Sequence, residues 1–352
     1  MSKENRITEI SEIGEFGLIE RITKDVRIKN DTTLKGIGDD AAVIRSSNKC
    51  VVLSTDLLTE GIHFNLMYVP LKHLGYKAVI VNISDIFAMN AIPKQITVNL
   101  ALSNKFSVEA VEELYSGIHL ACEKYNVDLV GGDTTSSLTG LTISISVLGE
   151  AEKDKLVYRS GAKPTDLICV SGDLGGAYMG LQLLERENEV FKINNEMQPQ
   201  LEGYDYIIER QLKPEAREDI IAAFKRLEIQ PTSMIDISDG LSSEVIHLCK
   251  SSNTGCAVHE EKIPLDVQTK KMAEELNINP LVAALNGGED YELLFTLPLE
   301  DYDKIKNDPD FTVIGHMTEK QEGTNLITTG GTKVELWAQG WNHHNKKPPS
   351  DS

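Results

Sequence analysis

The chain has 352 residues, 41% of them hydrophobic and 25% charged, a composition ordinary for a globular protein. This length exceeds what one hydrophobic core usually supports, so we expect two domains, 1–150 and 151–352. The formal net charge of −19 argues against a nucleic-acid-binding surface, because a polyanion would be repelled. No apolar run reaches the roughly 18 residues of a membrane span, so neither nucleic acid nor membrane is an expected partner.

The first half of the chain reads as mixed α and β structure. The hydrophobic pattern predicts, in chain order, a helix over 16–26, two strands flanking 46–48, a helix over 71–89, a strand over 95–102, a helix over 108–125 and strands over 128–130 and 141–148. The last strand alternates apolar residues with Ser and Thr, which predicts one buried face and one polar face or subunit contact. The charged stretch 150–155 then predicts a surface crossing between the domains.

The second half continues the same α+β rhythm. It predicts a strand over 166–170, a glycine turn over 171–176, a helix to 184, a loop or insertion over 185–203, helices over 206–212 and 216–227, a helix from 240 to 251, a strand over 256–259, a helix over 267–276, a strand over 291–297 and closing short strands. The glycine turn matches neither GxGxxG nor the P-loop, so packing is favoured over phosphate binding there.

Cysteine usage and the N-terminus bear on the compartment. The five cysteines contain no CxxC pair and lie within or beside apolar stretches, so we expect buried, unpaired thiols. The first ten residues are polar and lack the apolar core of a signal peptide. The expected location is the reducing cytoplasm.

Six short acidic clusters, each closing or following an apolar run, carry the strongest functional signal. They are GDD at 38–40, STD at 54–56, NISD at 82–85, GGD at 131–133, DISDG at 236–240 and GGED at 287–290. Turn formation would explain any one of them. Carboxylates mixed with hydroxyl and amide oxygens are the ligands that Mg²⁺ prefers, often shared with substrate phosphates. Together the clusters favour one divided metal site and nucleotide chemistry, because cations are needed to bring phosphates to a carboxylate-lined cleft.

Single clusters leave alternatives open. Asn82 and Asp85 share one face of an otherwise apolar helix, where a buried acid requires a cation and a surface acid is the weaker alternative. The run at 54–56 ends a strand and suits a metal or a turn cap equally. Asp239 is expected to cap the helix that follows it. Past the domain boundary, Arg159 and Lys163 offer cations for phosphate, although solvation is the stronger interpretation of Lys163.

Eight motifs in chain order form a combination far more specific than any one of them: GIGDDAAV, STDLLTEGIHF, YKAVIVNISDIFAMNA, VGGDTT, YRSGAKPTD, SMIDISDGL, GGEDYELLFT and QGWNHH. Over nearly the whole chain they resemble the thiamine-phosphate kinases, within the superfamily of aminoimidazole-ribonucleotide synthetase. The resemblance implies an α+β homodimer whose N-terminal domains contribute strands to a shared barrel, with ATP and several Mg²⁺ in a cleft between the N-terminal and the C-terminal α+β domains. It implies ATP-dependent phosphorylation of thiamine phosphate to thiamine diphosphate. The sequence does not decide whether a monovalent cation assists.

Carried over residue by residue, the resemblance implies four sets of site residues. The metal ligands would be Asp40, Ser54, Thr55, Asp56, Asp85, Asp133, Asp236 and Asp239. The nucleotide would contact Tyr115, Gly132, Asp133, Arg159 and Ser238. Thiamine phosphate would contact His63, Glu289 and Trp341. The catalytic residues would be Asp40, Asp133, Arg159 and Asp239. The sequence departs from the family pattern at Ile62, before His63, where a polar residue is common.

Two other functions remain as alternatives. The first is another ATP-using member of the superfamily, such as an aminoimidazole-ribonucleotide synthetase-like enzyme. A selenophosphate synthetase should carry a reactive Cys or selenocysteine in an N-terminal glycine-rich loop, and the first 49 residues contain no cysteine. The second is a non-catalytic module that binds Mg²⁺ and nucleotide, which would bind ATP without turnover.

Overall fold

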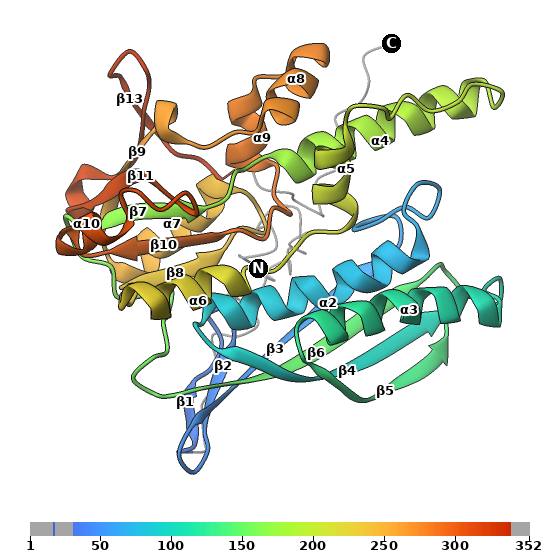
Figure 1. Cartoon of the computed structure of the whole chain (residues 1–352), viewed down its shortest axis with the longest axis horizontal. Helices are drawn as coiled ribbons and strands as arrows, with labels where there is room; N and C mark the ends of the chain where they lie inside the picture. Colours follow the sequence, from blue (N-terminus) through green and yellow to red (C-terminus); the bar gives the residue numbers. More distant parts are fainter. Residues whose placement is uncertain (1–16, 18–30, 339–352) are drawn as a thin grey trace, which may run out of the picture.

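The computed structural model describes residue 17 and residues 31–338, which form two β-sheets with helices packed against them (Figure 1). The first part of the chain contains the strands β1 (Thr33–Lys35), β2 (Ala42–Arg45), β3 (Cys50–Thr59), β4 (Ile92–Leu102), β5 (Asp128–Ser136) and β6 (Thr142–Ala151), and the helices α2 (Leu71–Ala88) and α3 (Val108–Lys124). The strands form a sheet in the order β1-β2-β3-β6-β4-β5, in which β4 and β5 are parallel and the other neighbours antiparallel.

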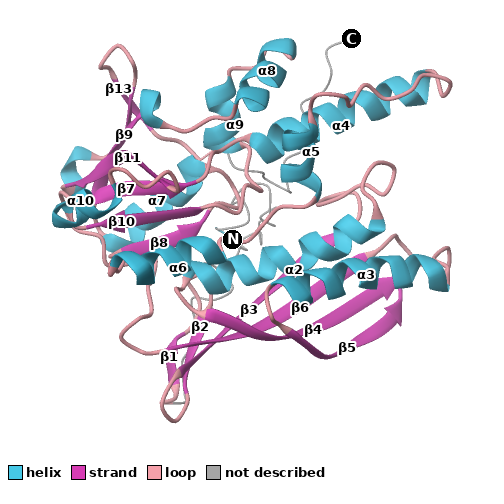
Figure 2. Cartoon of the chain, viewed as in Figure 1, coloured by secondary structure: helices cyan, strands magenta, loops and turns pink. Residues whose placement is uncertain are grey.

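Helices α2 and α3 cover one face of this sheet, and no helix of residues 31–338 covers the other (Figure 2). In β6 the apolar residues Ile143, Ile145 and Val147 are buried under the helices, as is Leu141 just before the strand, while the intervening Ser and Thr residues face the uncovered side. The expected alternation in this strand is confirmed. The same period places Ser54 and Asp56 of β3 on the covered face and Thr55 on the uncovered face.

Two glycines let α2 and α3 approach with their backbones almost in contact. A Cβ atom on Gly75 would lie 2.0 Å from the carbonyl oxygen of Leu114, and one on Gly117 would lie 1.8 Å from that of Lys72. Helix α2 therefore lies fixed between α3 and the sheet. Most of its surface is buried, including the polar side chains of Lys77, Asn82 and Ser84.

The later part of the chain forms the second sheet, in the order β13-β12-β9-β11-β7-β10-β8. Its strands are β7 (Leu167–Ser171), β8 (Ser233–Asp236), β9 (Gly255–His259), β10 (Leu293–Leu297), β11 (Phe311–Thr318), β12 (Thr324–Ile327) and β13 (Lys333–Glu335). Its helices are α4 (Gly176–Ile193), α5 (Asp205–Leu212), α6 (Glu218–Leu227), α7 (Leu241–Ser252), α8 (Val267–Glu275), α9 (Pro280–Asn286) and α10 (Tyr302–Ile305), with short 3₁₀ turns at Glu260–Lys262, Leu299–Asp301 and Lys320–Glu322. Antiparallel pairing of β8 with β10 sets Asp236 opposite Leu293, so the segments 236–240 and 287–291 lie side by side.

Most expected elements are present, with differences at their ends. The mixed α+β class is confirmed, and the helices over 71–89 and 108–125 agree to within one residue. The predicted loop over 185–203 is wrong in its first half, because α4 continues to Ile193. Its charged residues form the solvated part of a helix rather than a break. The predicted helix over 16–26 lies outside the described residues apart from residue 17, and the division at 150/151 stays a prediction.

All five cysteines are unpaired and buried, as predicted. Cys50 and Cys122 belong to the core of the first sheet and its helices, and Cys169, Cys249 and Cys256 to the cores around the second. Among residues 31–338, no helix has the length and apolar character needed to cross a membrane.

Candidate active site

Three carboxylates from distant parts of the chain meet between the two sheets. Asp40 precedes β2, Asp85 lies on α2 and Asp236 ends β8, and each offers an oxygen atom within 4.8 Å of the other two. Asp40 and Asp236 are buried, and Asp85 is half-buried. These three residues are hereafter called the acidic triad. The predicted convergence of these acidic clusters is therefore present in the fold.

Hydroxyl and amide groups fix the positions of these carboxylates. Ser54 donates hydrogen bonds to the Asp85 carboxylate and, at 3.2 Å, to the backbone oxygen of Asp40. Ser84 Oγ donates to Asp236 Oδ2 at 2.5 Å, which joins α2 to the end of β8. Asn82 Oδ1 accepts the backbone N–H of Asp56 at 3.0 Å and so ties β3 to α2. The side chains that hold the triad and Asp56 in place thus come from β3 and α2.

Burial raises the pKa values of the acidic residues at this site. Burial raises the pKa of Asp40 to about 7, against the lowering effect of Arg159. Burial also raises the pKa values of Asp56 and Asp236 to about 6. The pKa of Asp85 lies well above its ordinary value because burial and the charges of Asp56 and Asp236 disfavour its ionised form. A bound cation would lower these pKa values and stabilise the ionised carboxylates.

The donor set fits a hard divalent cation. It consists of carboxylate and hydroxyl oxygens without sulfur or imidazole, which favours Mg²⁺ over softer metals. The buried Oδ2 atom of Asp56 has no hydrogen-bond partner among the described residues. A buried carboxylate oxygen without a donor is costly, and a bound cation would remove that cost. Asp40, Asp56, Asp85 and Asp236 are the residues that could hold Mg²⁺ here.

Arg159 forms a two-pronged ion pair with the triad. Its Nε and Nη2 atoms donate to the two oxygens of Asp40 at 3.0 and 2.8 Å. Its backbone N–H donates to Asp39 Oδ1 at 3.1 Å, and Lys35 Nζ lies 3.1 Å from the other Asp39 oxygen. Asp39 therefore holds the backbone around the site, while the Arg159 side chain faces the cavity.

A cavity of about 610 Å³ opens beside the triad. The predicted site residues that line it are Asp40, Ser54, Thr55, Asp56, His63, Asp85, Arg159, Asp236, Ser238, Asp239 and Glu289. His63 Nδ1 accepts the backbone N–H of Thr59 at 3.0 Å, which fixes its ring at the cavity wall. Asp239 does not cap α7 as expected. Gly240 is the N-cap without a side-chain hydrogen bond, and Glu244 Oε1 accepts the Asp239 N–H at 3.0 Å instead.

The loop 287–291 forms the far wall and adopts an unusual backbone. Glu289 and Tyr291 have φ values of 59° and 51°, which are uncommon for residues other than glycine. Their N–H groups donate to the backbone oxygens of Ser238 at 2.7 Å and Ile237 at 2.9 Å. Between them, Asp290 Oδ2 accepts the N–H of Gly175 at 2.7 Å. The loop is therefore fixed on both sides.

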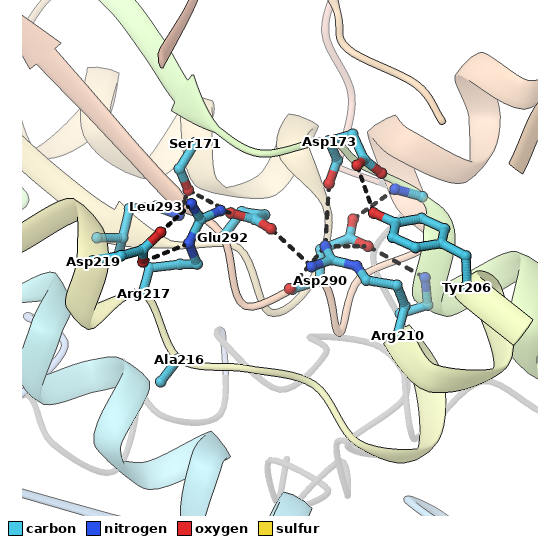
Figure 3. A network of polar contacts seen from close by, with 12 residues as sticks. Ser171, Asp173, Tyr206, Arg210, Ala216, Arg217, Asp219, Asp290, Glu292 and Leu293 are labelled. Carbon is cyan, nitrogen blue, oxygen red and sulfur yellow. Dashed lines mark hydrogen bonds and ion pairs between the residues drawn. The ribbon is translucent and has the colours of Figure 1, made fainter. Parts of the chain in front are cut away.

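A buried ionic network anchors this loop to its helices (Figure 3). Arg210 of α5 donates to the backbone oxygen of Asp290 at 3.1 Å and to Glu292 Oε1 at 2.8 Å. Arg217 and Ser171 donate to the other Glu292 oxygen. Burial raises the pKa of Asp290 to about 7, opposed by Arg210. Glu292 thus pairs with two arginines directly before β10 begins.

Five predicted site residues lie apart from the triad or outside the description. Gly132 and Asp133 are exposed on β5, at the sheet edge. Since β6 and β4 separate β5 from β3, Asp133 lies roughly 14 Å across the sheet from β3. Thr55 lines the cavity, but its hydroxyl is turned from the triad to the uncovered face, where it donates to the backbone oxygen of Ile145 at 3.0 Å. Tyr115 packs beside His119 on α3, and Trp341 lies outside the described residues.

Several cavity residues were not among the predicted site residues. The cavity is also lined by Gln211, Glu244, His247 and Tyr291. Lys77 forms an ion pair with Glu289 at the cavity wall. The signal for Lys77 was its spacing of eight from Asp85, which places both on one stripe of α2. Gln211, Glu244 and His247 had no signal in the sequence, because they reach the cavity through the packing of α5 and α7. Tyr291 follows the GGED cluster directly, and the backbone of the loop 287–291 brings it to the cavity.

Comparison with known proteins shows which fold class the chain has. A family model described as AIR synthase related protein, N-terminal domain, matches residues 38–151. A hydrogenase maturation protein HypE in complex with ATP aligns over 93% of this chain and 96% of that chain, with a TM-score of 0.65 and 19% identity. At that identity the likeness concerns the fold. The chain has the fold of AIR-synthase-related proteins.

Closer relatives define the family. The thiamine-monophosphate kinase of Aquifex aeolicus (strain VF5) is 37% identical over 335 residues, 95% of this chain and 99% of that protein. That of Bacillus subtilis (strain 168) is 34% identical over 94% of this chain and 99% of its own length. A solved structure described as AaThiL complexed with AMPPCP and TMP has a TM-score of 0.80 and 36% identity, covering 96% and 99% of the two chains. The chain belongs to the thiamine-monophosphate kinase family.

Proposed function

We propose that this chain is a kinase that uses ATP to phosphorylate thiamine phosphate to thiamine diphosphate. The observation that carries the proposal is the acidic triad at the wall of a large cavity, in a chain of the thiamine-monophosphate kinase family. A relative of 36% identity has been solved with AMPPCP and TMP. Both of these ligand descriptions fit a cavity lined by oxygen ligands and a guanidinium group.

The chain's own residues would hold Mg²⁺ and orient the phosphates. Asp40, Asp56, Asp85 and Asp236 supply the oxygens, and Ser54 and Ser84 hold two of these carboxylates in place. When bound, Mg²⁺ would neutralise phosphate charge in this acidic site. Arg159, now paired with Asp40, would exchange part of that pair for a phosphate oxygen. Ser238 and Asp239 lie at the same wall and complete its polar lining.

Transfer is proposed to be direct and in line. The second pKa of a phosphate monoester is about 6, so the attacking oxygen is largely ionised at neutral pH and needs no strong general base. The barrier is repulsion between two anions, which the site lowers by alignment and charge neutralisation. Incubation with radiolabelled ATP alone should leave no acid-stable label on the protein. Label that forms and disappears at the rate of turnover would show a phosphoenzyme instead.

Thiamine phosphate is proposed to occupy the part of the cavity lined by His63 and Glu289, with Trp341 as a further contact. A cationic thiazolium ring against an aromatic face gains roughly 0.5–2 kcal/mol. Trp341→Ala should therefore raise the KM for thiamine phosphate more than the KM for ATP. Equal effects on the two KM values would exclude that role.

A second copy of the chain is proposed to cover the exposed face of the first sheet. Leu57 and Leu148 on that face are 55% and 38% exposed, and Thr55, Ser144 and Asp133 lie on the same side. Exposed apolar side chains on an open sheet face favour a partner surface. In such a homodimer, with strands of both copies forming a barrel, Gly132 and Asp133 would contribute to a nucleotide site that one chain leaves incomplete.

The mass of the protein in solution tests this assembly. Light scattering after size exclusion should give twice the chain mass for the wild type. Leu57→Lys should yield the monomer mass, whereas Leu138→Lys, at a fully exposed loop residue, should not. A monomeric wild type would refute the dimer.

The decisive assay for the activity is Mg²⁺-dependent conversion of thiamine phosphate to thiamine diphosphate by the purified chain with ATP. Conversion that stops with EDTA and resumes with Mg²⁺ is the expected result. Nucleotide binding without conversion would favour the non-catalytic alternative, and conversion of an amide substrate instead would favour a synthetase. The proposed compartment is the cytoplasm, in keeping with five unpaired cysteines.

A further inference from the structure

We propose that Lys77 is a positioning residue for thiamine phosphate, which acts by holding Glu289 so that one carboxylate oxygen faces the ligand. This inference rests on the proposed function and assigns a specificity role to a residue of α2 outside the acidic triad. Lys77 is 4% exposed. A lysine is rarely buried to this extent without a specific partner.

The contacts of Lys77 all lead to the cavity wall. Its Nζ atom lies 3.0 Å from Glu289 Oε2 and donates to the backbone oxygen of Gln211 at 2.9 Å. Gln211 Nε2 donates to the same Glu289 oxygen at 3.1 Å. Lys77 therefore holds Glu289 directly and also fixes the residue that supplies the second hydrogen bond.

Both donors reach Oε2, which leaves Oε1 of Glu289 without a hydrogen-bond donor among residues 31–338 and available to a ligand. Glu289 lines the cavity, and its side chain keeps 26% of its exposure. Its backbone, with φ of 59°, is held by the bond from its N–H to Ser238. With backbone and one oxygen fixed, the other oxygen has a defined direction. Such a carboxylate suits an uncharged N–H donor or a cationic heterocycle.

Helix α2 sets the distance between this carboxylate and the acidic triad. Lys77, Val81 and Asp85 follow each other at intervals of four residues, and the last two line the cavity. At 1.5 Å per residue, Lys77 and Asp85 are about 12 Å apart along the helix. A ligand with a phosphate at one end and a nitrogen heterocycle at the other can therefore span from triad to Glu289. The geometry assigns the phosphate to the Asp85 end and the heterocycle to the Lys77 end.

The test compares Lys77→Met with the wild type in steady-state kinetics and in calorimetric titration with thiamine phosphate. Loss of a charge-assisted contact should raise the KM for thiamine phosphate about tenfold. The KM for ATP and kcat should stay within about twofold of the wild type, because the triad is untouched. Lys72→Met, at an exposed lysine on the same helix, is the matched control and should behave as the wild type.

A double-mutant cycle separates positioning from general damage. If Lys77 acts through Glu289, then adding Lys77→Met to Glu289→Gln should change the KM for thiamine phosphate by less than about twofold. An undiminished effect in that background, or equal rises in both KM values, would overturn the inference. If Lys77→Met fails to fold, Gln211→Leu is judged by the same criteria. A wild type that neither binds nor converts thiamine phosphate would refute the proposed function itself, whereas an active enzyme indifferent to Lys77 would refute this inference alone.

Discussion

The acidic triad gathers three carboxylates in a buried site. Each member therefore lowers the stability of the fold but supports the proposed chemistry. The pKa values of Asp40 and Asp236 are raised to about 7 and about 6 by burial, which reflects the cost of ionising them. The charge of Arg159 offsets part of that cost at both residues, and Arg159 also forms an ion pair with Asp40. Buried carboxylates that are unfavourable for folding and lie together indicate a ligand that compensates for them.

Asp85→Asn should separate these two effects. It removes one negative charge from the cluster while keeping an oxygen that can accept from Ser54. We expect a loss of Mg²⁺-dependent kinase activity of about 100-fold or more, with a melting temperature without metal equal to or above that of the wild type. Activity assays and thermal unfolding in EDTA measure the two. Asp128→Asn, at an exposed acid on β5, should alter neither, and full activity of Asp85→Asn would contradict the metal assignment.

Individual residues differ in how well the sequence reveals them. Asp40, Asp85 and Asp236 stand out because acids that interrupt apolar runs are rare without a role. Lys77 also interrupts an apolar helix, but the partner that explains it, Glu289, is 212 residues away. A long-range ion pair has no local pattern. The position of Asp133 on an edge strand is likewise a property of the sheet order, which the local sequence does not contain.

Helix α2 connects the triad, the Glu289 contact and the core, so its packing against α3 matters for all three. Gly75→Ala would place a Cβ 2.0 Å from the carbonyl oxygen of Leu114, and the helices would have to move apart. Overpacking of this kind costs about 1–3 kcal/mol or more. We expect lower stability in urea unfolding and lower kinase activity, because Asp85 moves with the helix. Gly330→Ala, whose nearest atom would be 3.9 Å away, is the control, and an unchanged stability of Gly75→Ala would show that the contact is looser than described.

Strand β10 begins at an ionic junction, and its integrity depends on Glu292. Glu292→Gln would leave Arg210 and Arg217 with weakened buried partners. Breaking a buried ion pair by removing one charge costs about 3–5 kcal/mol. Denaturant unfolding should show a loss of that order, while Asp303→Asn, in an exposed pair with Lys306, should change stability by less than about 0.5 kcal/mol. Similar small effects from both variants would mean that the network is open to solvent.

Elements with a strong hydrophobic period were predictable, and their ends were not. Helix α2 is apolar almost throughout and agrees with the sequence pattern to within one residue. Helix α4 continues to Ile193 through charged residues that resemble a loop, because its outer end is solvated. The cap of α7 also differs, since Glu244 reaches back to the Asp239 N–H from within the helix.

At the scale of the whole molecule, the raised carboxyl pKa values make stability depend on pH and metal together. Asp40, Asp56 and Asp236 have an ordinary value of 3.8 and titrate at about 6–7 in the fold. Between these values the folded chain holds more protons than the unfolded chain, so the stability present below about pH 3.8 is lost progressively as the pH rises to 7. Bound Mg²⁺ would replace those protons.

Thermal unfolding at pH 5 and pH 8, with EDTA or with MgCl₂, tests this linkage. In EDTA the melting temperature should be lower at pH 8, since the clustered acids are then forced to ionise. Mg²⁺ should raise the melting temperature more at pH 8 than at pH 5, because protons compete with it at the lower pH. An equal Mg²⁺ effect at both pH values would disprove the coupling. Asp290, with a pKa of about 7, would leave a residual pH dependence that metal does not remove.

The α+β class and the convergence of distant acidic clusters could be inferred from the sequence, because they follow from the apolar runs and from the order of the motifs. The strand orders of the two sheets could not, since they depend on long-range pairings such as Asp236 with Leu293. The distance of Asp133 from the triad likewise follows from the strand order of the first sheet.

The five buried thiols give this protein an internal set of reporters. A maleimide cannot reach a thiol in a closed core, so labelling in native buffer proceeds only when the surrounding segment opens. Cys50 and Cys122 report on the first sheet and its helices, and Cys169, Cys249 and Cys256 on the second. Mass spectrometry of the labelled peptides would therefore show which of the two sheets opens first. No cysteine has to be introduced by mutation for this measurement.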